Sequence, residues 1–232
     1  GGPYPNGLAF DGQYIWVSNN FSDSIYQLDI GFQSAPEIVV LGDTVEIVNE
    51  DESPDVIDLT DFGMLCLGDS ATAIFQIKNE GSAPLTIDIP VVLMGLDSAD
   101  FNVTVQPDST VAPGDSTFMT VQFLPLDTGL RATNLSFVNN DVNENPYSFA
   151  IHGRAMLADT SVSSANNTLT SGADSAIYQW VDCDHDFIHI AGATEQSFVV
   201  PTSGSYAVIV IQNGCIDTCL LYTSPSPRDE QS

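Results

Sequence analysis

One stretch of the chain, residues 70–156, constrains the fold more than any other, because it holds a long series of alternating segments separated by turn residues. The segments are rich in β-branched and aromatic residues and end at Gly, Pro, Asn or Asp: SATAIFQIKNEG, PLTIDIPVVL, FNVTVQ, STFMTVQFLP, LRATNLSFVNND and PYSFAIHGRA. Side chains alternate faces along a strand, so Phe75 and Ile77 share one face, and Tyr147, Phe149 and Ile151 share another. These faces predict the core of an antiparallel β-sandwich.

The length and charge of the chain restrict its architecture and partners. With 232 residues it is long enough for two sandwiches of about 100 residues each. Against 31 Asp and Glu there are only 4 Lys and Arg, giving a net charge of −27, so no basic stripe exists for nucleic acid, and anionic membranes repel the chain. No apolar run is long enough to predict membrane insertion. The dispersed acidic residues suit either calcium-containing surroundings or simple solubility.

The first 30 residues contain GLAFDGQYIWVSNNFSDSIYQLDI, which predicts two apolar strands around an Asp11-Gly12 turn and a third strand after a polar turn. This pattern resembles a repeat of the NHL or YVTN class of β-propellers. The resemblance implies that residues 1–30 are a partial blade, and because a lone blade cannot bury its faces, the rest of the propeller is expected upstream. The alternative is a hairpin packed on the next domain. We expect the chain, which begins GGPYPNG, to be a fragment.

Residues 31–56 are interpreted as a linker with a first strand that leads into the sandwich, and residues 57–157 as the sandwich itself. Its motifs are TDFG, IKNEGSAPLTI, DFNVT, VAPGDS, VQFLPLDTGLRATNLSFVNND and NPYSFAIHGRA. Over about 37–156 they resemble the choice-of-anchor D or Hydin-like (ASH) immunoglobulin-like domain. Several of these motifs carry turn chemistry, such as Asn79-Glu80-Gly81 after a buried strand.

Residues 158–218 predict a second immunoglobulin-like module, truncated at its end, with strand segments SVSSANNTLTS, AIYQWVDC, IAGATEQSFVVP and GSYAVIVIQNGC. Residues 206–211 are apolar on both faces, which favours a central strand. The set resembles the module that precedes the C-terminal sorting signal of many secreted Bacteroidetes proteins. That resemblance implies export to the cell surface or medium by the type IX route.

The final segment, residues 219–232, differs in composition from the rest. Its CLLYTSPSPRD run, at 219–229, resembles the conceptual translation of a DNA sequencing adapter. We interpret it as non-native sequence and exclude it from fold reasoning.

The cysteines at 66, 183, 215 and 219 allow several pairings. With Cys219 set aside, Cys183 and Cys215 lie in the same module on candidate neighbouring strands, and an exported protein would permit their oxidation. We therefore predict a Cys183–Cys215 disulfide, although a native strand lost from the end could have carried the partner of either. Cys66 is interpreted as a buried apolar residue.

The densest cluster of potential ligands is VDCDHDFIH, which mixes carboxylates and imidazoles, groups that bind divalent cations. The run from Asp182 lacks the sixth-position Gly and twelfth-position Glu of a calcium loop, so a solvated loop is the favoured interpretation. Asp182, Asp184 and Asp186 remain weak metal candidates, with calcium as the possible ion. The D-x-N-x-N run from Asp141 is interpreted as a turn.

Nothing in the sequence predicts catalysis or a bound cofactor. GxSxG, HExxH, GxGxxG and GxxxxGK[ST] are absent, and His152 falls on the face opposite the core residues of its strand. We expect a non-catalytic structural or presentation segment of a large secreted or cell-surface bacterial protein, whose partner is an unknown protein or glycan. The alternatives are an accessory tail of a secreted enzyme or sugar-binding propeller protein, and a calcium-dependent adhesion module.

Overall fold

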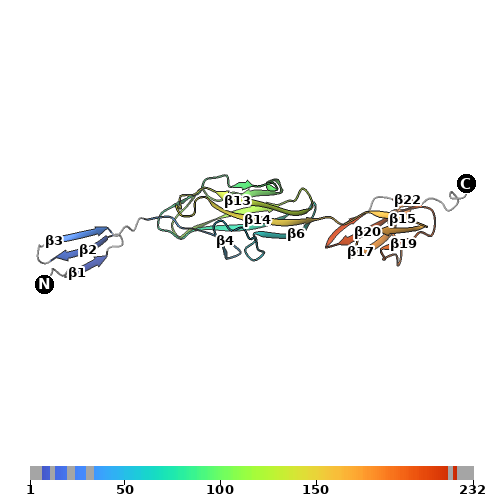
Figure 1. The fold of residues 1–232 in the computed structure, drawn as a ribbon, viewed down its shortest axis with the longest axis horizontal. Coiled ribbons are helices and arrows are strands. Elements are labelled where there is room, and N and C mark those ends of the chain that lie inside the picture. The colour runs from blue at the N-terminus through green and yellow to red at the C-terminus, as the bar shows by residue number, and fades with distance from the viewer. Residues whose placement is uncertain (1–6, 11–13, 20–23, 30–33, 219–221, 224–232) are drawn as a thin grey trace.

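The structure is a computed structural model that describes residues 7–10, 14–19, 24–29, 34–218 and 222–223. These residues form β-strands and two short 3-10 turns, η1 (Ser98–Asp100) and η2 (Cys183–His185), and no α-helix occurs among them. The predicted all-β class is therefore confirmed. Figure 1 shows the strands gathered into successive groups along the long axis of the molecule. In the described ranges, no helix is long and apolar enough to span a membrane.

The N-terminal group is a three-stranded antiparallel sheet in the order β1 (Gly7–Phe10), β2 (Tyr14–Asn19) and β3 (Ser24–Asp29). It contains the three strands predicted for this region, whereas the predicted Asp11-Gly12 turn lies outside the described residues. Large apolar side chains of this sheet are exposed, among them Leu8 and Ile25, each 70% exposed.

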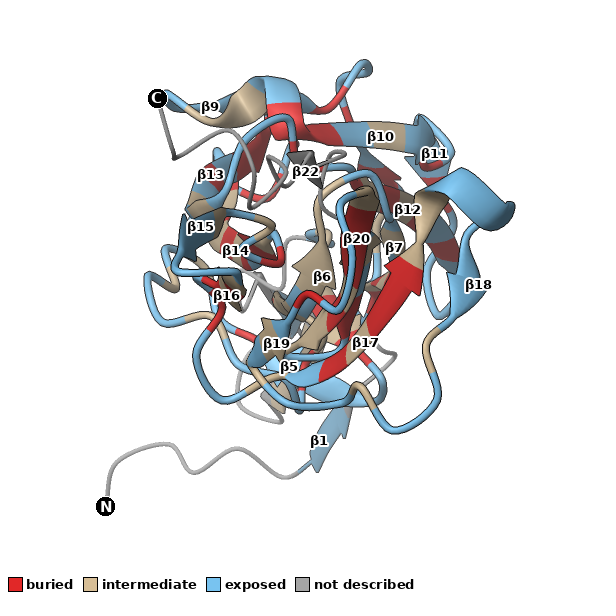
Figure 2. Ribbon diagram, turned by 90° about the vertical axis from the view of Figure 1, so that its right-hand side faces the viewer, coloured by how far each residue is buried: buried red, intermediate tan, exposed pale blue. Residues whose placement is uncertain are grey.

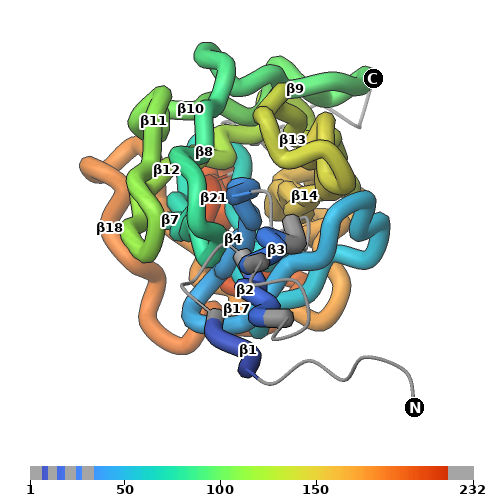
Figure 3. Tube along the Cα trace, turned by 90° about the vertical axis from the view of Figure 1, so that its left-hand side faces the viewer, coloured from blue at the N-terminus to red at the C-terminus, as the bar shows by residue number. Residues whose placement is uncertain are grey.

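The first sandwich has a five-stranded sheet in the order β10-β12-β7-β4-β5 and a four-stranded sheet in the order β6-β14-β13-β9. Figure 3, viewed from the N-terminal end, shows β7 beside β12 and β4. The strands of the first sheet are β4 (Ile38–Gly42), β5 (Val45–Ile47), β7 (Ala71–Asn79), β10 (Phe101–Val105) and β12 (Ser116–Phe123). Those of the second are β6 (Asp61–Cys66), β9 (Val92–Met94), β13 (Gly129–Phe137) and β14 (Tyr147–Met156). The short pair β8 (Leu85–Thr86) and β11 (Thr110–Val111) lies beside them.

The core of the first sandwich follows the predicted alternation. Buried and more exposed residues alternate along β7, β12 and β14. Phe75 of β7 meets Phe149 of β14 edge-on, with ring centroids 5.3 Å apart, so the inner faces of the two sheets are in contact. The predicted inward faces of these strands are confirmed.

Two features of the first sandwich differ from the sequence interpretation. The PLTIDIPVVL segment contains two short strands, β8 and β9, because Pro90 has no N–H to donate to a ladder. Strand β6 was not predicted, and it pairs in parallel with β14, so the sandwich is not purely antiparallel. The strand expected within residues 31–56 is present as β4, which lies in the sheet between β7 and β5.

The second sandwich is smaller and has its own buried cluster. One sheet has the order β15-β16-β19, and the other has the order β18-β17-β20-β21. Their strands are β15 (Val162–Ala165), β16 (Thr168–Ser171), β17 (Ile177–Asp182), β18 (Ile188–His189), β19 (Ser197–Val199), β20 (Ser205–Gln212) and β21 (Cys215–Thr218). Figure 2 shows the buried stretches of β17 and β20 side by side. Strand β20 is central, as its two apolar faces predict.

Within 219–232, only Tyr222 and Thr223 are described. They form β22, which pairs with Ser205 and Tyr206 at the start of β20. The rest of the predicted non-native segment, including Cys219, lies outside the described residues, so its origin stays a prediction.

Candidate functional site

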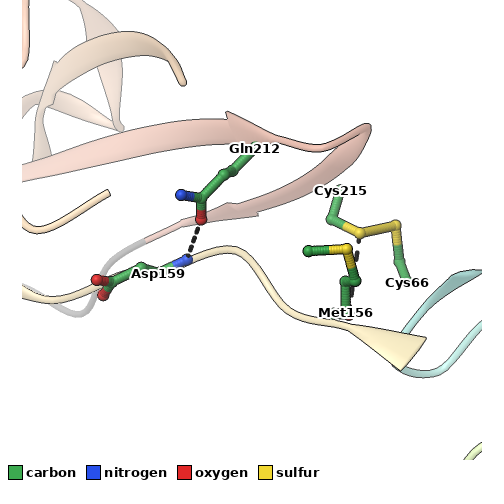
Figure 4. Close-up of a disulfide and its surroundings, with 5 residues drawn as sticks. All are labelled: Cys66, Met156, Asp159, Gln212 and Cys215. Atoms are coloured by element: carbon green, nitrogen blue, oxygen red, sulfur yellow. Dashed lines mark hydrogen bonds between the residues drawn. A yellow bond between two sulfur atoms is a disulfide. The ribbon is translucent and has the colours of Figure 1, made fainter. Parts of the chain in front are cut away.

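The disulfide in the structure joins Cys66 to Cys215, with Cα atoms 5.4 Å apart and 149 residues between them in sequence. The predicted Cys183–Cys215 pairing is therefore wrong, and so is the interpretation of Cys66 as only an apolar residue. The bond joins β6 of the first sandwich to β21 of the second (Figure 4).

The register of β20 explains why the predicted pairing fails. Cys183 follows Asp182, which pairs with Tyr206 near the start of β20, whereas Cys215 pairs with Gln212 at its end. Six residues of extended strand span about 20 Å, far beyond the reach of a disulfide. Both cysteines lie in the same module, but their strands are not neighbours, because β20 lies between β17 and β21.

Cys66 reaches the second sandwich because β6 runs beside the last strand of the first. Cys66 pairs with Met156, where β14 ends, and the Leu67 N–H donates to the Met156 carbonyl at 2.7 Å. The side chains of Cys66 and Met156 pack against the buried cluster of the second sandwich. Cys215 is 3% exposed within that cluster, and its sulfur lies 3.9 Å from the Met156 carbonyl oxygen. The disulfide is thus the centre of an apolar contact between the sandwiches.

The loop predicted as a weak metal site uses its carboxylates for local structure. Asp182 accepts from the Asp184 N–H at 3.0 Å and lies 3.0 Å from His185 Nδ1. Asp184 accepts from the Ser205 N–H at 2.9 Å, and the hydrogen bonds from the Ser205 backbone and hydroxyl hold the pKa of Asp184 below its ordinary value. Asp186 takes a left-handed conformation at the end of η2. The hydrogen bonds of these carboxylates close a turn and attach it to β20. Calcium binding by this loop stays a prediction.

A different acidic group, not singled out from the sequence, forms in the first sandwich. Oxygens of Glu37, Asp141 and Glu144 lie within 4.8 Å of one another, the one such set of three among the described residues. Asp141 is 2% exposed and accepts from the Ile38 N–H at 2.9 Å, so it joins β4 to the turn after β13. Burial, followed by the negative charges of Asp141, Glu37 and Glu46, raises the pKa of Glu144. No local motif connects residues this distant in sequence.

Two surface hollows lie on the first sandwich and at the junction. The first, about 540 Å³, has an acidic rim of Glu50, Asp51 and Glu52 beside β13 and β14. The second, about 390 Å³, is lined by residues 128–129 and 154–159, where the chain leaves the first sandwich. His152 lies elsewhere on β14, with Nε2 3.3 Å from Asp61 Oδ1 on β6.

A buried ion pair orders the loop before β10. Asp100 is 1% exposed, accepts from Arg131 Nε at 2.6 Å and from the Leu126 N–H at 2.7 Å. A second Arg131 nitrogen lies 2.8 Å from Asp97, and the hydrogen bond with Asp100 is the main cause of the raised pKa of Arg131. This rare cation therefore attaches η1 to β13.

Residues 50–146, which include most of the first sandwich, match the family model described as abnormal spindle-like microcephaly-associated, ASPM-SPD-2-Hydin (ASH). The first sandwich is similar to an ASH immunoglobulin-like domain. The match begins after β4 and β5 and ends before β14, although these strands complete the two sheets. The predicted resemblance to an ASH domain is confirmed at this level, over residues 50–146.

Solved structures show distant similarity. A protein of unknown function from Porphyromonas gingivalis is 15% identical, with 65% of this chain and 66% of that chain covered and a TM-score of 0.39. The ASH/PapD-like domain 7 of human CEP192 is 14% identical. The similarity covers 58% of this chain and 97% of that domain, with a TM-score of 0.35. The secreted serine protease VesC from Vibrio cholerae is 10% identical, with 72% and 49% covered and a TM-score of 0.35. This chain thus spans slightly less than two thirds of the first and about half of VesC. A comparison with curated protein sequences finds no match.

Proposed function

We propose that this chain is a non-catalytic structural segment that holds other parts of a larger secreted or cell-surface bacterial protein at a distance. The observation that carries the proposal is the junction between the sandwiches. Each sandwich uses its inward faces for its own core, and the two are joined in series by the chain and by the Cys66–Cys215 disulfide. A presentation role needs such a stiff, serial arrangement, whereas it needs no reactive group.

Export of the parent protein is supported by two observations. Disulfides persist in oxidising compartments, and this one is built into the contact between two folded units. The resemblance of residues 158–218 to a module of secreted Bacteroidetes proteins points in the same direction, to type IX export. A protein or glycan at the cell surface is the corresponding partner.

The N-terminal sheet supports the idea that this segment carries a propeller. Its apolar side chains, including Leu8, Ile25 and Tyr26, are at least half exposed, as expected for one blade without its neighbours. This favours a second candidate function, an accessory tail of an enzyme or sugar-binding propeller. Deleting residues 34–218 from the longer protein separates the two. Loss of surface presentation with retained head activity supports a spacer, whereas loss of that activity in solution supports an accessory tail.

Small-angle X-ray scattering of the full chain tests the spacer proposal. The expected pair-distance distribution is that of an elongated particle, with the two sandwiches one after the other as in Figure 1. A compact particle, with the sandwiches folded side by side, would overturn the proposal.

A further inference from the structure

The polypeptide crosses from the first sandwich to the second through a short connection. Strand β14 ends at Met156, β15 begins at Val162, and residues 157–161 lie between them. Ala158 is buried in the cluster of the second sandwich, and the Asp159 N–H donates to Gln212 Oε1 at 2.9 Å (Figure 4). A connection of this kind restrains distance, but by itself it leaves bending and twisting between two units open.

The disulfide adds a second covalent crossing beside the first. Cys66 ends β6, and Met156 ends β14, its parallel neighbour, so two adjacent strands of one sheet reach the second sandwich together. Cys66 is attached to Cys215, at the start of β21, next to the hairpin turn from β20. Figure 4 shows Met156 beside the bonded sulfurs. Two attachments on neighbouring strands restrain rotation as well as distance.

We propose that the Cys66–Cys215 disulfide is a redox-sensitive lock that sets the orientation of the second sandwich relative to the first. In the oxidised chain the sandwiches move as one body. In the reduced chain residues 157–161 remain as the covalent connection, and the sandwiches reorient while each stays folded. This rests on the proposed presentation function, because it states how that segment is kept stiff.

The opening step is thiol–disulfide exchange with an external dithiol. A thiolate of the dithiol attacks the sulfur of half-buried Cys66, and Cys215 leaves as a thiolate that takes up a proton. The second thiolate of the dithiol then displaces Cys66 from the mixed disulfide. In total, two electrons and two protons pass from the dithiol to the protein, which gains two thiols while the dithiol becomes a disulfide.

Two features argue that each sandwich keeps its fold when the lock opens. The core of the first sandwich does not include either cysteine. In the second, Cys215 is one buried member of a cluster that also includes Trp180, Leu169 and Val208, all 0% exposed. The bond therefore lies where the two units meet, and most residues of either core are held by their own packing.

The test is NMR on the full chain, with residual dipolar couplings measured for amides of both sandwiches. Four samples are compared: oxidised wild type, wild type reduced with dithiothreitol, the Cys66→Ala/Cys215→Ala variant, and Cys183→Ala, which keeps the disulfide. The oxidised wild type and Cys183→Ala are expected to show one alignment tensor for both sandwiches. In the other two samples the tensors separate, with the degree of order of the second sandwich falling below that of the first, while both amide spectra stay dispersed.

Three outcomes would overturn the proposal. One is a shared tensor in the reduced and double-alanine samples, which would show that the apolar contact alone holds the orientation. Another is collapse of the second sandwich's spectrum in both, which would make the bond a requirement for folding and not a lock. The third is non-reducing peptide mapping that finds Cys215 bonded to a residue other than Cys66. A shared tensor with an elongated scattering profile would leave the spacer function standing, whereas a compact profile would remove it whatever the tensors show.

Discussion

The two sandwiches differ in how far they close their own cores. The first buries residues from two broad sheets, and the buried Asp100 and Asn79 satisfy backbone groups of its loops. The second has a smaller cluster, and two side chains packed against it, Cys66 and Met156, come from the first sandwich. The first is thus self-contained, whereas the second depends on its neighbour for part of its cover. When the two sandwiches separate, the second is therefore expected to lose more of its apolar cover than the first.

The largest test of this asymmetry removes one core aromatic from each sandwich. Phe75→Ala and Trp180→Ala each delete a fully buried ring and are expected to cost about 3–5 kcal/mol. Phe75→Ala should increase hydrogen exchange throughout the first sandwich and, in the second, around the residues that pack on Cys66 and Met156, because these lose their cover when the first opens. Trp180→Ala should increase exchange in the second alone. Hydrogen exchange measured by mass spectrometry on peptides from each sandwich checks this. If each variant increases exchange in the other sandwich to the same extent, the asymmetry is contradicted.

A second test concerns a buried amide found in the first sandwich. Asn79 is 0% exposed, donates to the Ala83 and Val111 carbonyls at 2.8 and 3.0 Å, and accepts from the Gly81 N–H at 3.1 Å. Asn79→Ala leaves these groups without their partner, and we expect a loss of about 2–3 kcal/mol by chemical denaturation. The control Asn102→Ala removes an exposed amide from β10. Equal losses in the two variants would show that the buried amide has no special role.

Matched tyrosine variants compare one interaction in both sandwiches. The hydroxyl of buried Tyr147 donates to the Ile47 carbonyl, and that of Tyr178 donates to the Ala173 carbonyl at 2.5 Å. Tyr147→Phe and Tyr178→Phe each lose one hydrogen bond, worth about 1 kcal/mol. Regional hydrogen exchange should show the Tyr147→Phe loss in both sandwiches and the Tyr178→Phe loss in the second. If Tyr147→Phe increases exchange only in the first sandwich, this hydrogen bond does not couple the two sandwiches.

The sequence predicts the buried faces of single strands, which depend on local alternation. It does not predict the contacts between segments that are distant in the chain. The inward faces of β7, β12 and β14 follow from a two-residue period, and Asn79 was identified as a turn residue from its own neighbourhood. Strand β6 was missed because Gly63, with φ of +74°, interrupts its pattern and because its partner β14 lies far along the chain. Periodicity states which face is buried, but it does not state which strands become neighbours.

The same limit explains the errors at the candidate sites. The pairing of Cys66 with Cys215 depends on β6 and β14 ending at the same level, which no single segment encodes. The group of Glu37, Asp141 and Glu144 depends on β4 lying close to the turn after β13, because Asp141 accepts from Ile38, 103 residues away. Both contacts depend on how strands that are distant in sequence are arranged in space, so the sequence alone does not predict them.

The smallest expected effect is a pH-dependent one, confined to the first sandwich. The pKa of Glu144 is raised from an ordinary 4.5, with burial as the main cause and neighbouring carboxylates as the next. A carboxyl with a higher pKa in the folded chain binds its proton more tightly there, so this group destabilises the fold as the pH rises from 4.5 through the raised pKa. Glu144→Gln removes that penalty.

The variant should therefore be more stable than wild type at neutral pH, by about 0.5 kcal/mol or less, and the gain should vanish below pH 4.5. Thermal melts across the acid range measure it, with Glu52→Gln as a control that removes an exposed charge outside this group. A gain of the same size in the control would assign the effect to the net charge of −27. If Glu144→Gln instead lowers the stability, the charge of Glu144 supports the turn. The prediction that this acidic group destabilises the fold would then be wrong.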